Sequence, residues 1–334
     1  MEFDFFIGID VSKDELDFSV QQGKCFLFHR EIRNEPGSIK AFLKELKKLP
    51  GFEMNKAVFC MEHTGIYNNH ALSCLYEKNG NICLEAASQI KNSMGNIRGK
   101  NDKVDSVRIA EYAYKNRESL RLWEPKREVL VQLANYSAIR SRLLTTEKIL
   151  KTPLKELAGF SKKKVARQNQ VLCNPTLKAV KGDLARVDQA IAAVISGDPE
   201  LKRLFDIVTS VCGIGKVTGV QMLITTNEFK DINQAKQYAC YAGVAPFTDE
   251  SGKVKKKARV SHMANKKVKT LLHLAAMVAI QYNPDLKSFY ERKTGEGKHK
   301  MSVINAVRNK LIERIFACVN QNRKYEKNYC RLVA

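Results

Sequence analysis

The sequence predicts three parts: an α/β layered N-terminal domain, a helical hairpin and a mainly α C-terminal domain. Short apolar runs alternate with amphipathic segments over residues 1–122, which is typical of an α/β domain. Long apolar stripes at helical spacing fill residues 123–204, and helical patterns broken by glycines occupy residues 205–334. A chain of 334 residues with 44% hydrophobic content is long and apolar enough to form cores of this kind.

The N-terminal domain begins with three short apolar runs, and the second and third are separated by Gly23. The predicted elements in order are strands at 3–9, 16–22 and 24–32, a helix after Pro36, a strand at 56–62, a helix at 66–78, a strand at 81–87 and a helix at 102–114. Three meandering strands followed by alternating helices and strands match the ribonuclease H-like order. The predicted class of this domain is therefore α/β ribonuclease H-like.

The middle region carries an apolar stripe from Leu130 to Leu150, which predicts one long helix. A basic stretch at 161–170 is expected to interrupt the helical pattern, and a second helix is expected from Pro175 to about Ser196. Two long helices around a break indicate a coiled-coil-like hairpin that serves as a spacer or an oligomerisation arm. The alternative is that its basic run contacts nucleic acid, through Lys162, Lys163, Lys164 and Arg167.

The C-terminal domain contains the segment SVCGIGKVTGVQML, which indicates a helix-hairpin-helix-like element. Gly213 and Gly215 allow a close backbone approach, and the amides at the helix that starts near Lys216 can hold a phosphate. A plain tight turn is the alternative interpretation. Amphipathic helices are expected at 266–281 and 298–320.

The charge of the chain is large and unevenly distributed. The 57 Lys and Arg residues against 35 Asp and Glu residues give a formal net charge of +22. Residues 1–120 contain 17 of each sign, so the surplus lies entirely in the remainder. A balanced domain can devote carboxylates to chemistry, while a strongly basic remainder favours a polyanionic partner, most often nucleic acid.

The location of the protein is also indicated by composition. No run of about 18 apolar residues is present, so no membrane span is expected. The start of the chain carries Glu2 and Asp4 where a secretory signal would be basic. The nine cysteines form no CxxC pair, which favours reduced core residues over a zinc site. We expect a cytoplasmic protein.

Four carboxylates stand out by position. Asp10 ends the first predicted strand, Glu62 ends another, and Asp102 and Asp105 share one face of a helix because they are three residues apart. Brought together, four such groups repel one another and need a hard cation, for which Mg²⁺ (or Mn²⁺) with a phosphate substrate is the usual case. Taken singly, each acid is more simply a surface residue, and Asp102 a helix cap.

Three N-terminal motifs carry a family resemblance. FIGIDVSKDELDFSV, MEHTGIYNNHAL and RGKNDKVDSVRIAEYA resemble those of the DEDD-type insertion-sequence transposases, a group often called "IS one-ten" that includes pilin-gene invertases. The first domain of that family is similar to the RuvC-type Holliday-junction resolvase. The resemblance implies that Asp10, Glu62, Asp102 and Asp105 are the metal-binding and catalytic set. One departure is Ser106, where the family commonly has alanine.

The segment YAGVAPFTDESGKVKKKARVSHMANKKVKTLLHLAA resembles the second transposase domain of the same family. Its hallmarks are the Gly-x-x-Pro element that begins at Gly243 and the Ser-Gly pair that begins at Ser251. The resemblance implies that Ser251 is the nucleophile that attacks a DNA phosphodiester; Tyr241 is disfavoured because no supporting Arg/His/Arg set is evident. An acid-free basic run follows and is expected to bind backbone phosphate, through Lys253, Lys255, Lys256, Lys257, Arg259, Lys266, Lys267 and Lys269.

The resemblance implies a DNA recombinase of prokaryotic cytoplasm that excises and inserts its own element through a covalent phosphoserine intermediate. It further implies guidance by a structured bridge RNA, and dimers that pair into a tetramer, with Ser251 of one subunit meeting the carboxylates of another. A site-specific invertase of the same family is the nearest alternative. A RuvC-like structure-specific nuclease would need the carboxylates but not Ser251. A non-enzymatic nucleic-acid-binding scaffold would need neither.

Overall fold

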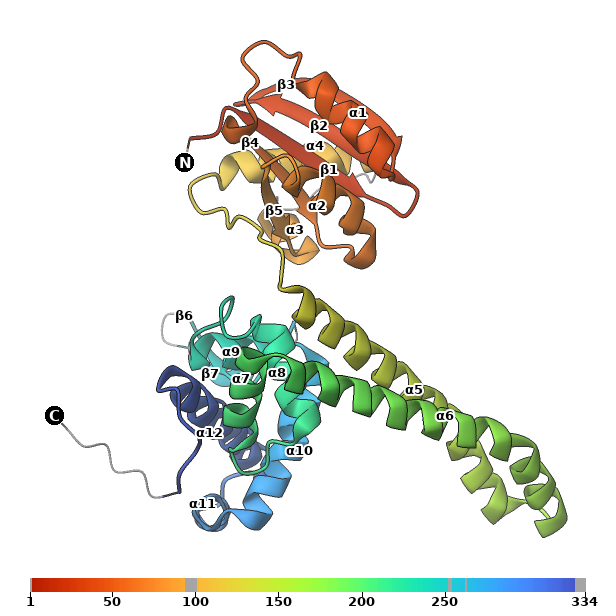
Figure 1. The fold of residues 1–334 in the computed structure, drawn as a ribbon. Helices are drawn as coiled ribbons and strands as arrows, with labels where there is room; N and C mark the ends of the chain where they lie inside the picture. The colour runs from red at the N-terminus through yellow and green to blue at the C-terminus, as the bar shows by residue number, and fades with distance from the viewer. Residues whose placement is uncertain (1, 94–100, 252–253, 262, 328–334) are drawn as a thin grey trace. The chain divides into compact units, whose positions relative to one another are not determined.

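The computed structural model describes residues 2–93, 101–251, 254–261 and 263–327, and it leaves the side chains of 248–258 undescribed. The chain divides into two compact units, Met1–Pro125 and Lys126–Ala334. The first unit is a five-stranded sheet with helices on both faces, and the second is built mainly of helices (Figure 1). A finer division of the chain at 122 and 204 stays a prediction.

The sheet of the first unit has the strand order β3-β2-β1-β4-β5. Its strands are β1 (Phe5–Val11), β2 (Glu15–Gln22), β3 (Cys25–Arg33), β4 (Ala57–Glu62) and β5 (Asn81–Glu85). The first three strands are antiparallel neighbours, and β4 and β5 add in parallel beside β1. This arrangement confirms the α/β ribonuclease H-like class predicted from the order of the apolar runs.

Helices cover both faces of that sheet because its central strands are apolar on both sides. One face packs against α1 (Pro36–Leu46) and α2 (Asn69–Tyr76), and the other packs against α4 (Asp102–Lys115). The remaining elements are the short helix α3 (Ala87–Ser93) and the 3₁₀ turns η1 (Met54–Lys56) and η2 (Gly65–Asn68). The side chain of Phe6 faces α4, and those of its neighbours Phe5 and Ile7 face α1 and α2.

Helix α4 approaches β1 unusually closely at Gly8. A Cβ atom added to Gly8 would lie 2.0 Å from the carbonyl oxygen of Ser106 and 2.4 Å from the amide nitrogen of Ala110. Only glycine allows this contact. A buried hydrogen bond of 2.7 Å between the hydroxyls of Ser19 and Ser106 joins the same helix to β2. These contacts fix the height of α4 above the sheet.

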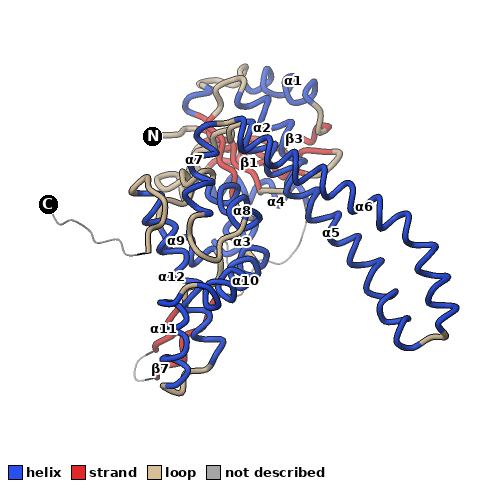
Figure 2. Tube along the Cα trace, turned by 60° about the horizontal axis from the view of Figure 1, so that its bottom comes forward, coloured by secondary structure: helices blue, strands red, loops and turns tan. Residues whose placement is uncertain are grey.

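The second unit starts with two long antiparallel helices, α5 (Glu128–Phe160) and α6 (Lys163–Gly197), that lie side by side (Figures 1 and 2). The predicted hairpin is present, but the predicted break at 161–170 is wrong, because only two residues separate the helices. Pro175 lies inside α6 and does not begin it. The helix continues through this proline because packing along α5 offsets the one backbone hydrogen bond that proline removes.

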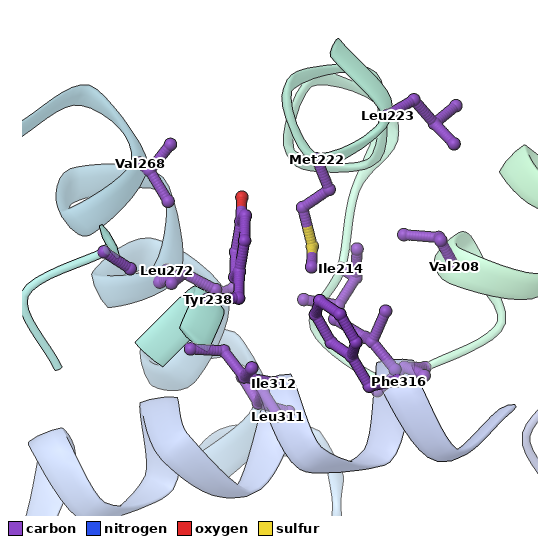
Figure 3. Packing of buried hydrophobic residues seen from close by; sticks show 14 of the residues in the cluster. Val208, Ile214, Met222, Leu223, Tyr238, Val268, Leu272, Leu311, Ile312 and Phe316 are labelled. Atoms are coloured by element: carbon purple, nitrogen blue, oxygen red, sulfur yellow. The ribbon is translucent and has the colours of Figure 1, made fainter. Parts of the chain in front are cut away.

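Shorter elements form the rest of the second unit. They are α7 (Pro199–Thr209), α8 (Lys216–Thr226), α9 (Ala235–Tyr241), β6 (Pro246–Ser251), β7 (Val254–Val260), α10 (Lys266–Tyr282), α11 (Pro284–Gly295) and α12 (Lys300–Asn320). The buried ring of Tyr238 lies among Met222, Leu272 and Phe316 in their common core, which also includes Leu133 from the base of the hairpin (Figure 3). The two helices predicted near 266–281 and 298–320 are α10 and α12. Within the described ranges, no helix is apolar over a length that would cross a bilayer.

Candidate active site

The first two predicted acidic residues lie at one edge of the sheet. Strands β1 and β4 are parallel, with Ile9 opposite Met61, so Asp10 and Glu62 come next at the carboxyl ends of neighbouring strands. Asp10 is two residues after Gly8 and therefore faces the same side of the sheet, the side that α4 covers. Main-chain geometry alone thus brings the two carboxylates to the edge beneath α4.

The other two acidic residues lie in the first turn of α4. Asn101 caps this helix, since its side-chain oxygen accepts a hydrogen bond of 3.0 Å from the amide of Lys103. Asp102 is therefore not the cap, and its side chain is not needed for that role. Asp105 is half-buried and forms an ion pair of 2.7 Å with Arg108, one turn further along.

The electrostatics of Asp10 indicate that all four carboxylates are near one another. Burial raises the pKa of Asp10 to about 6, and the negative charges of Asp105, Asp102 and Glu62, in that order, contribute to the rise. A like charge raises a carboxyl pKa because it disfavours the ionised form, and the effect is appreciable only at short range. The structure therefore brings the four predicted residues into one electrostatic neighbourhood.

This donor set suits a hard divalent cation, because oxygen ligands and uncompensated negative charge are what such ions require. A bound cation would reverse the rise in the pKa of Asp10. Across the described ranges, no three His, Cys, Asp or Glu side chains are yet spaced so as to hold a metal ion. The carboxylates therefore lie near one another at the sheet edge, but farther apart than the ligands of a bound metal ion.

A fifth carboxylate at this edge was missed by the sequence reasoning. Glu85 ends β5 directly opposite Glu62, and its carboxylate accepts a hydrogen bond of 3.8 Å from the thiol of Cys83. The signal was available, because Glu85 ends an apolar strand just as Glu62 does. Gly8 was also missed, and nothing in a single sequence marks it as the contact point of a helix.

The predicted nucleophile lies in the second unit. Ser251 is the last residue of β6 and pairs with Val254 on β7, and its side chain lies outside the described part of the structure. This β-hairpin was not predicted. The Gly-x-x-Pro element leads into it: Gly243 has a positive φ of 62°, and the carbonyl of Val244 accepts a hydrogen bond of 2.7 Å from Asn305 on α12.

The predicted nucleic-acid contacts fall in three places. Gly213 has a φ of 92° and packs tightly against α10. Gly215 is the residue before α8, and a Cβ added there would meet nothing within 4 Å; exposed Lys216 begins the helix. Lys266, Lys267 and Lys269 lie in the first turn of α10, and burial followed by the charge of Arg140 lowers the pKa of Lys267. On β7, Arg259 is exposed. The side chains of the other three predicted contacts on this strand are not described by the structure: Lys255, Lys256 and Lys257. Lys253 lies outside the described residues.

A ribonuclease H-like sheet with carboxylates at one edge, followed by a basic helical unit, is typical of enzymes that process nucleic acids. Two family models support a narrower assignment. A DEDD-type IS110 model described as "Transposase" matches residues 7–157, and the "Transposase IS116/IS110/IS902 family" model matches residues 205–291. The chain belongs to the DEDD-type insertion-sequence transposase family.

The relatives found by sequence agree with this assignment. Pilin gene-inverting proteins of Moraxella bovis and Moraxella lacunata are each 24% identical over 331 residues, covering 96% of this chain and 98% of theirs. The insertion element IS110 43.6 kDa protein of Streptomyces coelicolor is 27% identical over 138 residues, 41% of this chain and 34% of its own length. A solved T. thermophilus RuvC in complex with a Holliday junction matches 36% of this chain and 99% of its own, at 13% identity and a TM-score of 0.27.

Proposed function

We propose that this chain is a DNA recombinase that excises and inserts a mobile element by cleaving and rejoining DNA strands. The observation that carries the proposal is that three carboxylates, those of Glu62, Asp102 and Asp105, lie near Asp10 in a chain of the DEDD transposase family. The net charge of +22, carried by the second unit, supports a nucleic-acid partner.

Asp10, Glu62, Asp102 and Asp105 are the residues that would hold Mg²⁺ (or Mn²⁺). When bound, such an ion offsets phosphoryl charge and favours the deprotonated form of a nearby hydroxyl. Helix α4 places two of the four carboxylates, and its contact with Gly8 fixes their height over the sheet. Arg108 fixes the position of the Asp105 side chain through their ion pair.

Ser251 is the proposed nucleophile. Its hydroxyl loses a proton and its oxygen forms a bond to phosphorus, while the bond from phosphorus to the leaving sugar oxygen breaks and that oxygen takes up a proton. The product is a phosphoserine diester, which conserves the phosphodiester bond, so that strands can rejoin without ATP. Following the family resemblance, we also propose a bridge-RNA guide and a dimer or tetramer whose subunits share the site.

A strand-cleavage assay tests the serine. Full-length protein with its co-purified RNA is incubated with Mg²⁺ and end-labelled element-junction DNA, and the products are separated on a denaturing protein gel. We expect a labelled protein–DNA adduct with the wild type and with Ser261→Ala, a control serine that follows the same hairpin. Ser251→Ala should give no adduct. Free cleaved DNA from both wild type and Ser251→Ala would instead indicate a RuvC-like hydrolase.

Sharing of the site between subunits is tested by complementation. The Asp10→Asn chain and the Ser251→Ala chain, each inactive by itself and each with its own tag, are mixed. If the site is shared, a mixed oligomer contains one site with both groups intact, so adduct should form on the Asp10→Asn chain, which keeps Ser251. If no mixed oligomer forms adduct, the shared site is wrong, even though the serine chemistry still stands.

Inversion of a DNA segment is the second candidate, and the full-length likeness to the pilin gene-inverting proteins favours it. The chemistry at the site would be the same, and only the arrangement of the DNA sites would differ. Element ends that flank the gene, in several genomic copies, would indicate transposition. A single copy between two inverted sites would indicate inversion.

A further inference from the structure

A cavity of about 950 Å³ opens at the base of the β6–β7 hairpin, within the second unit. Pro246 and Val260, which pair at the base of the hairpin, form one side, and helices α10 and α12 form the others. Among the described residues that line it, four are cationic and one is acidic: Arg259, Lys269, Arg308, Lys310 and Glu313. The single carboxylate already accepts a hydrogen bond of 2.6 Å from Asn309.

Arg308 is the most deeply placed of these cations, with only 6% of its surface exposed. Its Nη2 donates to Nδ1 of His273 at 2.6 Å, and its Nη1 donates to the side-chain oxygen of Asn305 at 3.3 Å. Its Nε is buried and has no hydrogen-bond partner. Within the described part of the chain, no carboxylate pairs with this guanidinium.

A buried cation without a counter-charge is costly, so its retention needs a reason. His273 and Asn305 are neutral partners that hold the guanidinium plane in place, and they leave its positive charge uncompensated. The guanidinium fork matches the oxygens of a phosphate group. Lys269, which also lines the cavity, adds positive charge at its rim.

The cavity is continuous with the element that leads to the proposed nucleophile. Val244 and Pro246 of the Gly-x-x-Pro element line it, and Asn305 binds both the carbonyl of Val244 and the guanidinium of Arg308. Ser251 is five residue steps along strand β6 from Pro246, which at about 3.3 Å per step is at most about 17 Å. On a DNA duplex that distance corresponds to about five base-pair steps.

We propose that this cavity binds one backbone phosphate of the nucleic acid, several nucleotides from the phosphodiester that Ser251 attacks, with Arg308 as the positioning residue. The inference rests on the proposed function in taking nucleic acid as the ligand. DNA and RNA share the phosphodiester group, so the chemistry of the cavity admits either strand. Its role is to set the register of that strand relative to the β6–β7 hairpin.

The test measures binding and needs no cleavage. Full-length protein freed of bound nucleic acid is titrated, without divalent metal, against a labelled DNA duplex and against an RNA hairpin with the same number of phosphates. Fluorescence anisotropy at several KCl concentrations gives the affinity and its salt dependence. The variants are Arg308→Gln, Arg308→Lys and Lys269→Gln. The control Arg292→Gln removes an equal charge from the exposed face of α11, away from the cavity lining.

We expect Arg308→Gln to weaken binding of one of the two probes by about tenfold and to lower the slope of log Kd against log salt by about 0.9, the contribution of one phosphate contact. Arg308→Lys should retain part of the affinity. Arg292→Gln should change neither quantity. The probe whose slope changes identifies the strand that the cavity holds. A purely structural role for Arg308 would lower the melting temperature and leave the slope unchanged.

An unchanged slope with both probes would overturn the proposal, as would an equal loss in Arg292→Gln. If Arg308→Gln does not fold, the salt slope of Lys269→Gln tests the proposal instead. The Lys269 side chain is partly exposed, so it can be replaced without disturbing the core. The proposed function fails in a different way: no Ser251-dependent adduct would form, while the salt slopes would still differ between variants.

Discussion

The two compact units of the chain place charge by different means. Residues 1–125 have no net charge, and their sheet gathers carboxylates from β1, β4 and α4 at one edge. Residues 126–334 carry the whole surplus of +22, much of it on long, exposed lysine side chains of helices. A strand end fixes the position of a short acidic side chain closely. A long lysine side chain on a helix surface can adopt many rotamers, so the position of its charge is poorly fixed.

This difference predicts unequal sensitivity to substitution. A short carboxylate that moves by one ångström leaves its place in a coordination shell, because ligand distances vary by only a few tenths of an ångström. A lysine that contacts backbone phosphate is one of many and can adjust its rotamers. Single changes in the first unit should therefore abolish activity, and single changes of exposed lysines in the second should only weaken binding.

The largest expected effect is that of Asp105→Asn. The neutral amide keeps the size of the side chain but removes a charge that the proposed metal site needs, so cleavage should fall by more than about 100-fold. Asp14→Asn, an exposed change in the same unit, should leave cleavage unaltered. Metal-free DNA binding should stay within about twofold for both variants, because phosphate contacts belong to the basic unit. Cleavage by Asp105→Asn at the wild-type rate would show that this carboxylate takes no part in the reaction, whereas a lack of metal-dependent cleavage by the wild type itself would favour a binding scaffold.

The next largest effect is expected from Gly8→Ala. The new methyl group would meet backbone atoms of α4 at 2.0 and 2.4 Å, so the helix must move away from β1 and take Asp102 and Asp105 with it. We expect the first unit to lose about 3 kcal/mol of stability, the upper end for overpacked positions. Cleavage should be lost even in the fraction that remains folded.

Urea unfolding followed by fluorescence measures that loss, because the one tryptophan of the chain, Trp123, packs against Tyr76 in the first unit. Gly37→Ala is the matched control, since a Cβ there meets nothing within 4 Å. It should change stability by less than about 1 kcal/mol. Equal behaviour of the two variants would show that α4 is not held by contact at Gly8.

The sequence predicted the first unit better than the second for a physical reason. Strands such as 57–62 are short apolar runs whose type and order are set locally, and acids that end them fall at the sheet edge by geometry. The contact at Gly8 depends on a helix about 100 residues later in the chain, which no local pattern records.

In the second unit, local signals were overridden or ambiguous. Pro175 reads as a helix start but lies inside α6, because packing against α5 outweighs one lost hydrogen bond. The β6–β7 hairpin escaped prediction because VKKKARV has few apolar residues, although the Ser-Gly pair in the sequence that precedes it is a turn signal. Arg308 was missed because the sequence of an amphipathic helix does not distinguish a buried arginine from an exposed one.

A smaller effect concerns the pH dependence of stability in protein stripped of divalent ions. The pKa of Asp10 is raised to about 6 by burial and then by its acidic neighbours, whereas the unfolded chain has the ordinary value of 3.8. Between these values the folded state binds more protons, so stability falls as pH rises from about 4 to about 6. Asp10→Asn cannot ionise and lacks this fall. The variant should be more stable than the wild type by about 1–2 kcal/mol at pH 7, allowing for solvent screening, and equal to it below pH 4.

Melting curves at pH 4 and pH 7 with a chelator measure the difference, and Asp14→Asn serves again as the control. A wild type as stable as Asp10→Asn at both pH values would mean that neither burial nor the acidic neighbours destabilise the ionised form of Asp10. Such a result would also mean that the first unit does not hold its carboxylates under mutual repulsion, which is the main electrostatic difference from the second unit.

The smallest expected effect concerns Ser106, the residue that follows Asp105 in α4. Its hydroxyl donates to the carbonyl of Lys103 at 2.8 Å, so the fully buried Ser19 hydroxyl donates to it in turn. Ser106→Ala leaves the Ser19 hydroxyl buried without an acceptor and should cost about 1–2 kcal/mol. The double variant with Ser19→Ala removes both groups, so its cost should fall below the sum of the two single costs by about 1 kcal/mol. Additive costs would show that this hydrogen bond does not hold α4 on the sheet, leaving Gly8 as the contact that positions the acidic residues of the first unit.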